Sequence, residues 1–202
     1  MINPTEVTNF NRSQAQTEQF ALFAILVAGK NSDVAAMKLE EICFKVFEES
    51  DGRRDVLTWI IENHEHRHEI QDFFKSHNTG QHTRIGTHID KMRFEIKNNI
   101  LLKLPVEELE KKMGPKTARF FMLHSIKDCE CIPLDTHILS WMRDNGADVP
   151  SATPKPGKRY REIEEECLAM FKELLPEWKS VAEKDLMVWM KQSGRVMKQK
   201  EN

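Results

Sequence analysis

The chain has 202 residues, of which 40% are hydrophobic and 31% are charged, and its formal net charge is −2 at pH 7. This length suits one compact domain or two closely packed subdomains, and the ordinary composition excludes a disordered or low-complexity protein. The near-neutral net charge gives no general sign of nucleic-acid binding. Function must therefore be sought in local charge clusters and in specific residues.

No targeting or membrane segment is evident in the sequence. The polar start MINPTEVTNFNRSQAQTEQ lacks the basic and apolar regions of a signal peptide, and the apolar run at 20–29 is too short to span a bilayer. Cys43, Cys129, Cys131 and Cys167 form neither a CxxC pair nor the closely spaced loop of an iron–sulfur protein. We expect an intracellular protein with reduced thiols, in the cytoplasm or nucleoid of a prokaryote or the nucleus of a eukaryote.

Sequence patterns of helices follow one another along the first half of the chain. Ser13 can cap a helix that runs to about Lys30, and Ser32 with Asp33 can cap a second one. Residues 53–77 hold one or two further helices, which end at the turn signal HNTG. Apolar residues at helical spacing define the expected buried faces of the first two helices: Phe20, Phe23, Ala24, Val27, Val34, Met37, Ile42 and Val46.

The second half continues the helical pattern, and neither an alternating strand pattern nor an internal repeat interrupts it. Helices are expected at about 84–101, after Pro105, from Pro115 onward, and at 135–145, 158–175 and 177–193. We therefore predict an all-α fold. Its core is expected to include six aromatic residues: Phe20, Phe23, Trp59, Phe73, Phe74 and Phe94.

Charge is unevenly distributed along the second half of the chain. Residues 111–161 carry ten Lys or Arg against five Asp or Glu, whereas residues 162–190 carry eight acidic against three basic residues. A basic stripe on one face would suit a phosphate backbone. Charge runs are also common on simply solvated faces, so this pattern needs a second signal.

The stretch MGPKTARFF, residues 113–121, reads as a turn that opens a helix. Gly114 can close the turn, and Pro115 suits the first helical position. Lys116 then lies in the first turn, where the helix macrodipole disfavours a cation by about 0.3–1 kcal/mol. Either Lys116 is an ordinary solvated lysine, or the dipole and some desolvation favour a neutral, nucleophilic amine.

A carboxylate follows at a second helix start. Asp135 directly precedes an apolar-periodic helix, 19 residues after Lys116, and can serve as its N-cap at a gain of about 1 kcal/mol. A capping carboxylate is held rigidly, which also suits it to act as a base or an electrostatic partner. One helix and a short connector separate the two residues, so both helix N-termini can face a single groove.

These residues carry a resemblance to a known family. Gly-Pro-Lys-Thr-Ala-Arg at 114–119, followed by Pro-Leu-Asp-Thr-His at 133–137, resembles the helix-hairpin-helix DNA glycosylases with a lysine nucleophile, and most closely the 8-oxoguanine DNA glycosylase/AP lyases. Residues 16–42 are similar to the family's first two helices, and residues 183–198 resemble the ending of its short microbial branch.

The resemblance implies a single DNA glycosylase domain, residues 1–202, with two helical subdomains flanking a DNA-binding cleft. One subdomain covers about 30–130, with the hairpin near 105–127. The N-terminal helix and about 135–202 form the other. The implied partner is double-stranded DNA with a damaged or modified base, bound by a monomer away from any membrane. No cofactor is implied beyond a structural monovalent cation at the hairpin.

The resemblance also implies a role for each matching residue. Lys116 attacks C1′ of the damaged nucleotide and forms a Schiff base, after which β-elimination cuts the strand. Asp135 helps to deprotonate the lysine and stabilises positive charge on the sugar. DNA contacts are expected from Lys112, Gly114, Arg119 and His137. Trp189 is expected to stack on the extruded base and Lys198 to help read it.

Two departures from the family leave the substrate open. The hairpin reads LEKKMGPK, without the first glycine of the family's Leu-Pro-Gly-Val-Gly, and the chain continues as QKEN after Lys198. The leading substrate is 8-oxoguanine. Another modified base, such as a bulky modified cytosine in phage DNA, is the first alternative, and a non-catalytic DNA-binding module is the second.

A separate pattern, His64-Glu65-x-x-His68, matches the HExxH motif of zinc proteases. On one helix it would place both histidines on the same face, with Glu95 or His88 as a third ligand. Because the two intervening residues are polar, we expect a solvated helix face without a metal. A zinc enzyme is the most distant alternative.

Overall fold

The computed structural model describes residues 2–195, and all regular secondary structure in this range is helical. The all-α prediction is therefore confirmed. The helices are α1 (Gln14–Val27), α2 (Ser32–Glu49), α3 (Val56–Asn63), α4 (Arg67–Ser76), α5 (His82–Lys91), α6 (Arg93–Lys97), η1 (Leu101–Lys103), α7 (Val106–Met113), α8 (Pro115–Leu123), α9 (Thr136–Asp144), α10 (Lys158–Leu174) and α11 (Val181–Gln192). Within residues 2–195, none of these helices has the length and apolar composition needed to cross a bilayer.

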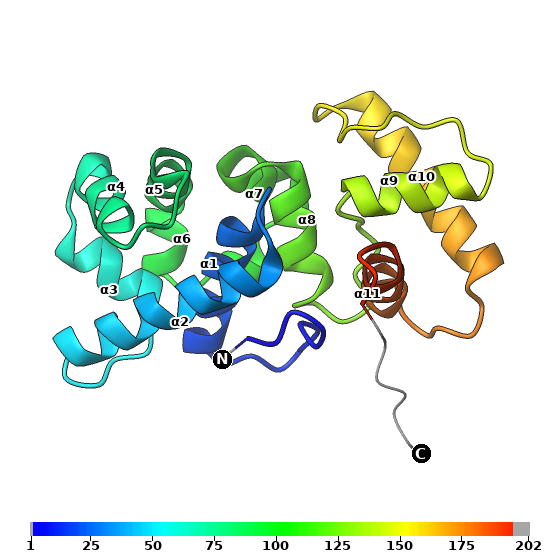
Figure 1. Cartoon of the computed structure of the whole chain (residues 1–202). Helices are drawn as coiled ribbons and strands as arrows, with labels where there is room; N and C mark the ends of the chain where they lie inside the picture. Colours follow the sequence, from blue (N-terminus) through cyan, green and yellow to red (C-terminus); the bar gives the residue numbers. More distant parts are fainter. Residues whose placement is uncertain (1, 196–202) are drawn as a thin grey trace, which may run out of the picture.

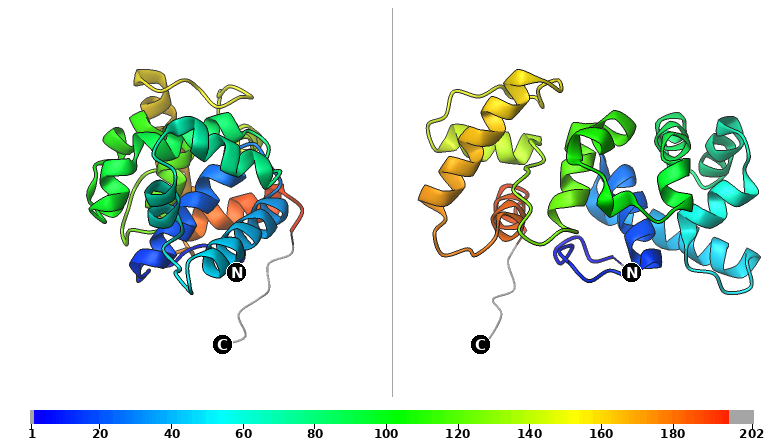
Figure 2. Two further views of the ribbon diagram at one scale, coloured as in Figure 1. Left: turned by 90° about the vertical axis from the view of Figure 1, so that its left-hand side faces the viewer. Right: turned by 180° about the vertical axis from the view of Figure 1, so that it is seen from behind.

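The helices form two groups, each with its own hydrophobic core. Figure 1 and the rear view in Figure 2 show α9–α11 beside the larger group α1–α8. The cores divide within the connector between α8 and α9, because Cys131 belongs to the first core and Ile132 to the second. Helix α11 contributes Ala182 to the first core and Val188 to the second, so it lies at the junction.

The N-terminal helix α1 is the centre of the larger group. Its apolar run from Phe20 to Leu26 is buried all round, as the sequence predicted. It contacts α2, α3 and α8, and Phe20 stacks on Phe121 of α8. We expected the N-terminal helix in the second subdomain, whereas the structure packs α1 within the larger group. A helix that is apolar on every side must be enclosed by neighbours, and α2, α3 and α8 provide them.

Some expected buried faces were also wrong. The buried stripe of α2 comprises Ala35, Leu39, Ile42 and Val46, so Met37 lies on the opposite side and is 61% exposed. Val34 is exposed as well. The expected helix at 84–101 is divided into three short pieces, and Phe94, in the five-residue α6, is 67% exposed.

The HExxH pattern does not lie on one helix. Helix α3 ends at Asn63 and α4 begins at Arg67, so a turn separates His64 from His68. The ring of His64 packs against Phe73, and its Nδ1 lies 2.8 Å from the Ile60 carbonyl oxygen. The geometry of a zinc-protease helix is therefore absent from this segment, and the zinc-enzyme alternative loses its basis.

A tight hairpin joins α7 to α8 and aims α8 at the second group. Gly114 forms the turn alone, with φ 82° and ψ 158°, a backbone conformation that other residues rarely adopt. Pro115 occupies the first helical position, as predicted. The hairpin thus sets the N-terminus of α8 opposite that of α9, on either side of the junction between the two groups.

Candidate active site

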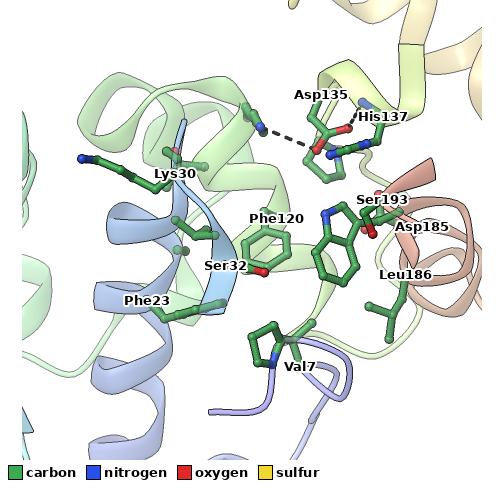
Figure 3. Close-up of a pocket in the computed structure, with 18 of the residues that line it drawn as sticks. Val7, Phe23, Lys30, Ser32, Phe120, Asp135, His137, Asp185, Leu186 and Ser193 are labelled. Atoms are coloured by element: carbon green, nitrogen blue, oxygen red, sulfur yellow. Dashed lines mark hydrogen bonds and ion pairs between the residues drawn. The ribbon is translucent and has the colours of Figure 1, made fainter. Parts of the chain in front are cut away.

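A cavity of about 470 Å³ lies at the junction between the two groups. Its volume is within the range of about 300–1,000 Å³ that is usual for ligand sites. Residues from α1, the α1–α2 turn, α8, the start of α9 and α11 line it, and Figure 3 shows their side chains converging from both groups. This cavity is hereafter called the cleft.

Lys116 and Asp135 meet at this cleft. The Lys116 Nζ atom lies 3.6 Å from Asp135 Oδ2, although the two residues belong to different groups of helices. The lysine side chain is 37% exposed, which leaves its amine open to a molecule entering the cleft. The structure therefore brings together the two residues that sequence reasoning placed at a common groove.

The two oxygens of Asp135 have separate partners. Oδ1 accepts hydrogen bonds from the backbone N–H groups of His137 and Ile138, both at 2.9 Å, so the predicted N-cap of α9 is present. Oδ2 is the oxygen that faces Lys116. Because capping fixes the carboxyl group through one oxygen, the other oxygen is held in position toward the amine.

Helices α8 and α11 each present a row of residues to the cleft at a spacing of four. This spacing brings side chains one above another on a single helix face. The first row comprises Lys116 and Phe120 of α8 and its C-cap His124, and the second comprises Asp185 and Trp189 of α11 and its C-cap Ser193. Sequence reasoning identified Lys116 and Trp189 but missed their neighbours one helical turn away, which the same spacing could have indicated.

A buried polar chain forms the inner wall of the cleft. His124 is fully buried, and its ring nitrogens lie 2.8 Å from Thr8 Oγ1 and 3.1 Å from Asp185 Oδ2. With its proton on Nε2, His124 donates to Asp185 and accepts the Thr8 hydroxyl proton at Nδ1. Burial raises the pKa of the Asp185 carboxyl, and the hydrogen bond from His124 opposes that rise. The cleft thus holds two carboxyl groups in different environments: Asp185 is buried against His124, whereas Asp135 caps α9 and faces Lys116.

Trp189, which we expect to stack on an extruded base, lines the cleft, and a cation lies over its ring. The Arg195 guanidinium carbon is 4.9 Å from the indole ring centroid, and the same group pairs with Asp33 at 2.6 Å. Arg195 therefore links the end of α11 to the start of α2 across one side of the cleft. Lys198, predicted to read the base, lies outside the described residues.

Arg119 was predicted to contact DNA, but the structure buries its side chain. The residue is 4% exposed and makes a bidentate contact with Glu164, with Nε–Oε1 at 2.7 Å and Nη2–Oε2 at 3.1 Å. Its guanidinium also pairs with Glu110 and lies over the Tyr160 ring. It points about a quarter turn away from the cleft row of α8, because successive helical residues are about 100° apart. Arg119 instead connects the two groups of helices.

The other three residues predicted to contact DNA, His137, Lys112 and Gly114, differ in whether they lie in the cleft. His137 lines the cleft beside Asp135. The Lys112 ammonium is already held by Glu95 Oε1 at 3.0 Å and by the Lys91 carbonyl oxygen at 2.9 Å. The Gly114 N–H donates to the Glu110 carbonyl oxygen at the end of α7. Of these residues, His137 is the one that the structure places in the cleft.

Comparisons with known proteins agree with this architecture. No protein-family model matches the chain. A crystal structure of the 8-oxoguanine glycosylase/lyase of Methanocaldococcus jannaschii, in complex with a 15mer DNA containing 8-oxoguanine, superposes with a TM-score of 0.66 at 20% identity, covering 96% of this chain and 89% of that one. A second structure of the M. jannaschii 8-oxoguanine DNA glycosylase gives the same TM-score and identity and is covered to 86%. The chain therefore has the all-α fold of the helix-hairpin-helix 8-oxoguanine DNA glycosylases.

Proposed function

We propose that this chain is a bifunctional DNA glycosylase/AP lyase that removes a modified base from double-stranded DNA, with 8-oxoguanine as the leading substrate. The observation that carries this proposal is the placement of Lys116 Nζ 3.6 Å from Asp135 Oδ2, at a cleft large enough for an extruded nucleotide. The fold shared with an 8-oxoguanine glycosylase/lyase supports it. Because the substrate is DNA, the activity belongs inside the cell.

The first step is displacement of the base. The neutral Lys116 amine attacks C1′, the N-glycosidic bond breaks, and its electron pair leaves with the base, which takes up a proton. Positive charge develops on the sugar as this bond breaks. The Asp135 carboxylate stabilises that charge across a short distance and accepts the proton that the lysine must lose.

The second step cuts the strand. Opening of the sugar ring converts the Lys116 adduct into a protonated Schiff base between Nζ and C1′. Loss of a C2′ proton then expels the 3′ phosphate by β-elimination, because the iminium group withdraws the electrons released at C2′. Hydrolysis of the remaining imine frees Lys116 for another turnover.

The inner cleft has features that suit an extruded purine. Phe120 and Trp189, from helices in different groups, line it and offer aromatic faces for stacking. Asp185 lines the same space and can accept hydrogen bonds from ring and amino N–H groups, which guanine carries on its pairing edge. This combination favours a guanine derivative, while a modified cytosine with an amino group remains the competing substrate.

Borohydride trapping tests the nucleophile. Reduction of the Schiff base should link the wild-type protein covalently to an 8-oxoguanine duplex, and Lys116→Gln should abolish this adduct. Lys30→Gln is the matched control, because Lys30 also lines the cleft but extends away from Asp135, with its ammonium beside Gly80 (Figure 3). Trapping that survives in Lys116→Gln but is lost in Lys30→Gln would identify Lys30 as the nucleophile and contradict the role proposed for Lys116.

A duplex panel tests the substrate. The wild-type protein is incubated with duplexes that carry 8-oxoguanine, other oxidised bases, modified cytosines or an abasic site, and strand cleavage is measured. Cleavage confined to modified cytosines would replace 8-oxoguanine with the alternative substrate. Tight binding to these duplexes with no cleavage of any of them would favour the non-catalytic DNA-binding module.

A further inference from the structure

Two cysteines outside the cleft lie in contact with each other. Cys129 Sγ and Cys131 Sγ are 3.1 Å apart, in the connector between α8 and α9. The Cys131 Sγ also lies 3.5 Å from the Arg119 carbonyl oxygen. The sequence analysis assigned no function to these cysteines, and the proposed glycosylase reaction uses neither thiol.

The two thiols differ in access. Cys129 is half-buried and lines a second cavity of about 110 Å³, whose other walls include Phe10, Leu123 and Ala182. Cys131 is buried. A small molecule can therefore reach Cys129 through this cavity, which Cys131 does not line.

The two thiols also differ in acidity. The hydrogen bond with Cys131 lowers the pKa of Cys129 to about 7, because it stabilises the thiolate. The same contact and burial raise the pKa of Cys131. Burial raises the pKa of Cys43 to about 11 and also raises that of Cys167. An accessible thiolate with a second cysteine beside it is the arrangement found in thiols that oxidise reversibly.

We propose that Cys129 and Cys131 form an oxidisable dithiol, in which Cys129 reacts with a small peroxide and Cys131 closes a disulfide. The Cys129 thiolate attacks the peroxide O–O bond, forming an S–OH bond and releasing hydroxide. The Cys131 sulfur then attacks Cys129, so that the S–S bond forms, the S–O bond breaks, and the Cys131 proton leaves with the hydroxide as water. Peroxide is the two-electron oxidant, and both thiols are oxidised.

Formation of the Cys129–Cys131 disulfide needs little change in the rest of the connector between α8 and α9. Downstream of the pair, the Ile132 N–H donates to Glu164 at 2.7 Å, and the Leu134 N–H donates to the Tyr160 hydroxyl at 2.9 Å. The Tyr160 hydroxyl in turn donates to the Ile132 carbonyl oxygen at 3.0 Å. These bonds hold the segment that leads to Asp135, so the disulfide can form by a local shift of residues 129–131.

Thiol counting with intact mass spectrometry tests the proposal. The native protein is treated with hydrogen peroxide near pH 7, and its free thiols are alkylated after denaturation. We expect the loss of two hydrogen atoms per chain and protection of Cys129 and Cys131, while Cys43 and Cys167 are alkylated. Cys43→Ser is the matched control and should form the same disulfide. Equal oxidation of all four cysteines, or a disulfide between other cysteines, would overturn the proposal.

Two further measurements test which cysteine reacts first and whether the two thiols act as a pair. Cys131→Ser should accumulate a sulfenic acid on Cys129 that dimedone traps, and the absence of this adduct would contradict the role of Cys129. The wild-type protein should bind phenylarsine oxide, a trivalent arsenical that bridges two thiols, and this should block alkylation of both cysteines. Independent alkylation of Cys129 and Cys131 in its presence would contradict the dithiol even if the serine variants failed to fold.

Discussion

Asp135 has two roles that one pair of substitutions can separate. Oδ1 caps α9 through two N–H groups, whereas Oδ2 faces the Lys116 amine at 3.6 Å. An asparagine preserves the capping oxygen and removes the negative charge. An alanine removes both. The comparison between Asp135→Asn and Asp135→Ala therefore distinguishes a structural aspartate from one that takes part in the reaction.

The expected effects on stability follow from the capping geometry. Loss of the cap in Asp135→Ala should cost about 1 kcal/mol. For a chain of this length this corresponds to a fall in Tm of about 2–4 °C. Asparagine caps about as well as aspartate, so Asp135→Asn should keep the cap and lose the attraction between a carboxylate and the helix dipole, about 0.3–1 kcal/mol, together with the attraction to Lys116.

The expected effect on activity is much larger. If Oδ2 stabilises the cationic sugar, Asp135→Asn should lower the rate of base excision about 100- to 1,000-fold, equivalent to about 2.7–4 kcal/mol. Single-turnover excision from a labelled 8-oxoguanine duplex, measured beside thermal unfolding of each variant, provides both quantities. Near-wild-type excision by Asp135→Asn, with a loss in Asp135→Ala that matches its stability, would reduce Asp135 to a helix cap and refute the reasoning.

Two more predictions follow from buried charges. Arg119→Ala leaves Glu110 and Glu164 without their cation, so the free energy of unfolding measured in urea should fall by about 3–5 kcal/mol. The salt dependence of DNA affinity should not change, because Arg119 is not expected to contact phosphate. A weaker salt dependence at normal stability would instead identify Arg119 as a DNA contact. Burial raises the pKa of Asp185 in the folded protein above its ordinary value of about 3.9. The stability gained from the protonated carboxyl is therefore complete below about pH 3.9 and is lost as the pH rises through the raised pKa. The Tm of Asp185→Asn, which cannot ionise, should therefore rise relative to that of the wild type as the pH increases above about 4, and a difference independent of pH would contradict the shift.

Long-range contacts explain why some residues were misjudged from the sequence. Arg119 looked like a surface cation in a basic stretch, but its main partner Glu164 is 45 positions away and on another helix. Phe94 looked like a core residue, but the chain around it breaks into short helices that leave its ring in solvent. His124 and Asp185, 61 positions apart, carried no pattern that paired them.

The sequence by itself determined the helical class and the starts of the helices that carry Lys116 and Asp135. Turns and caps are decided by neighbours within a few residues, so Pro115 and the Asp135 cap could be read directly. Only the tertiary structure decided which face of each helix is buried and which side chains share the cleft. Those outcomes depend on packing between segments far apart in the chain, and local patterns do not contain that information.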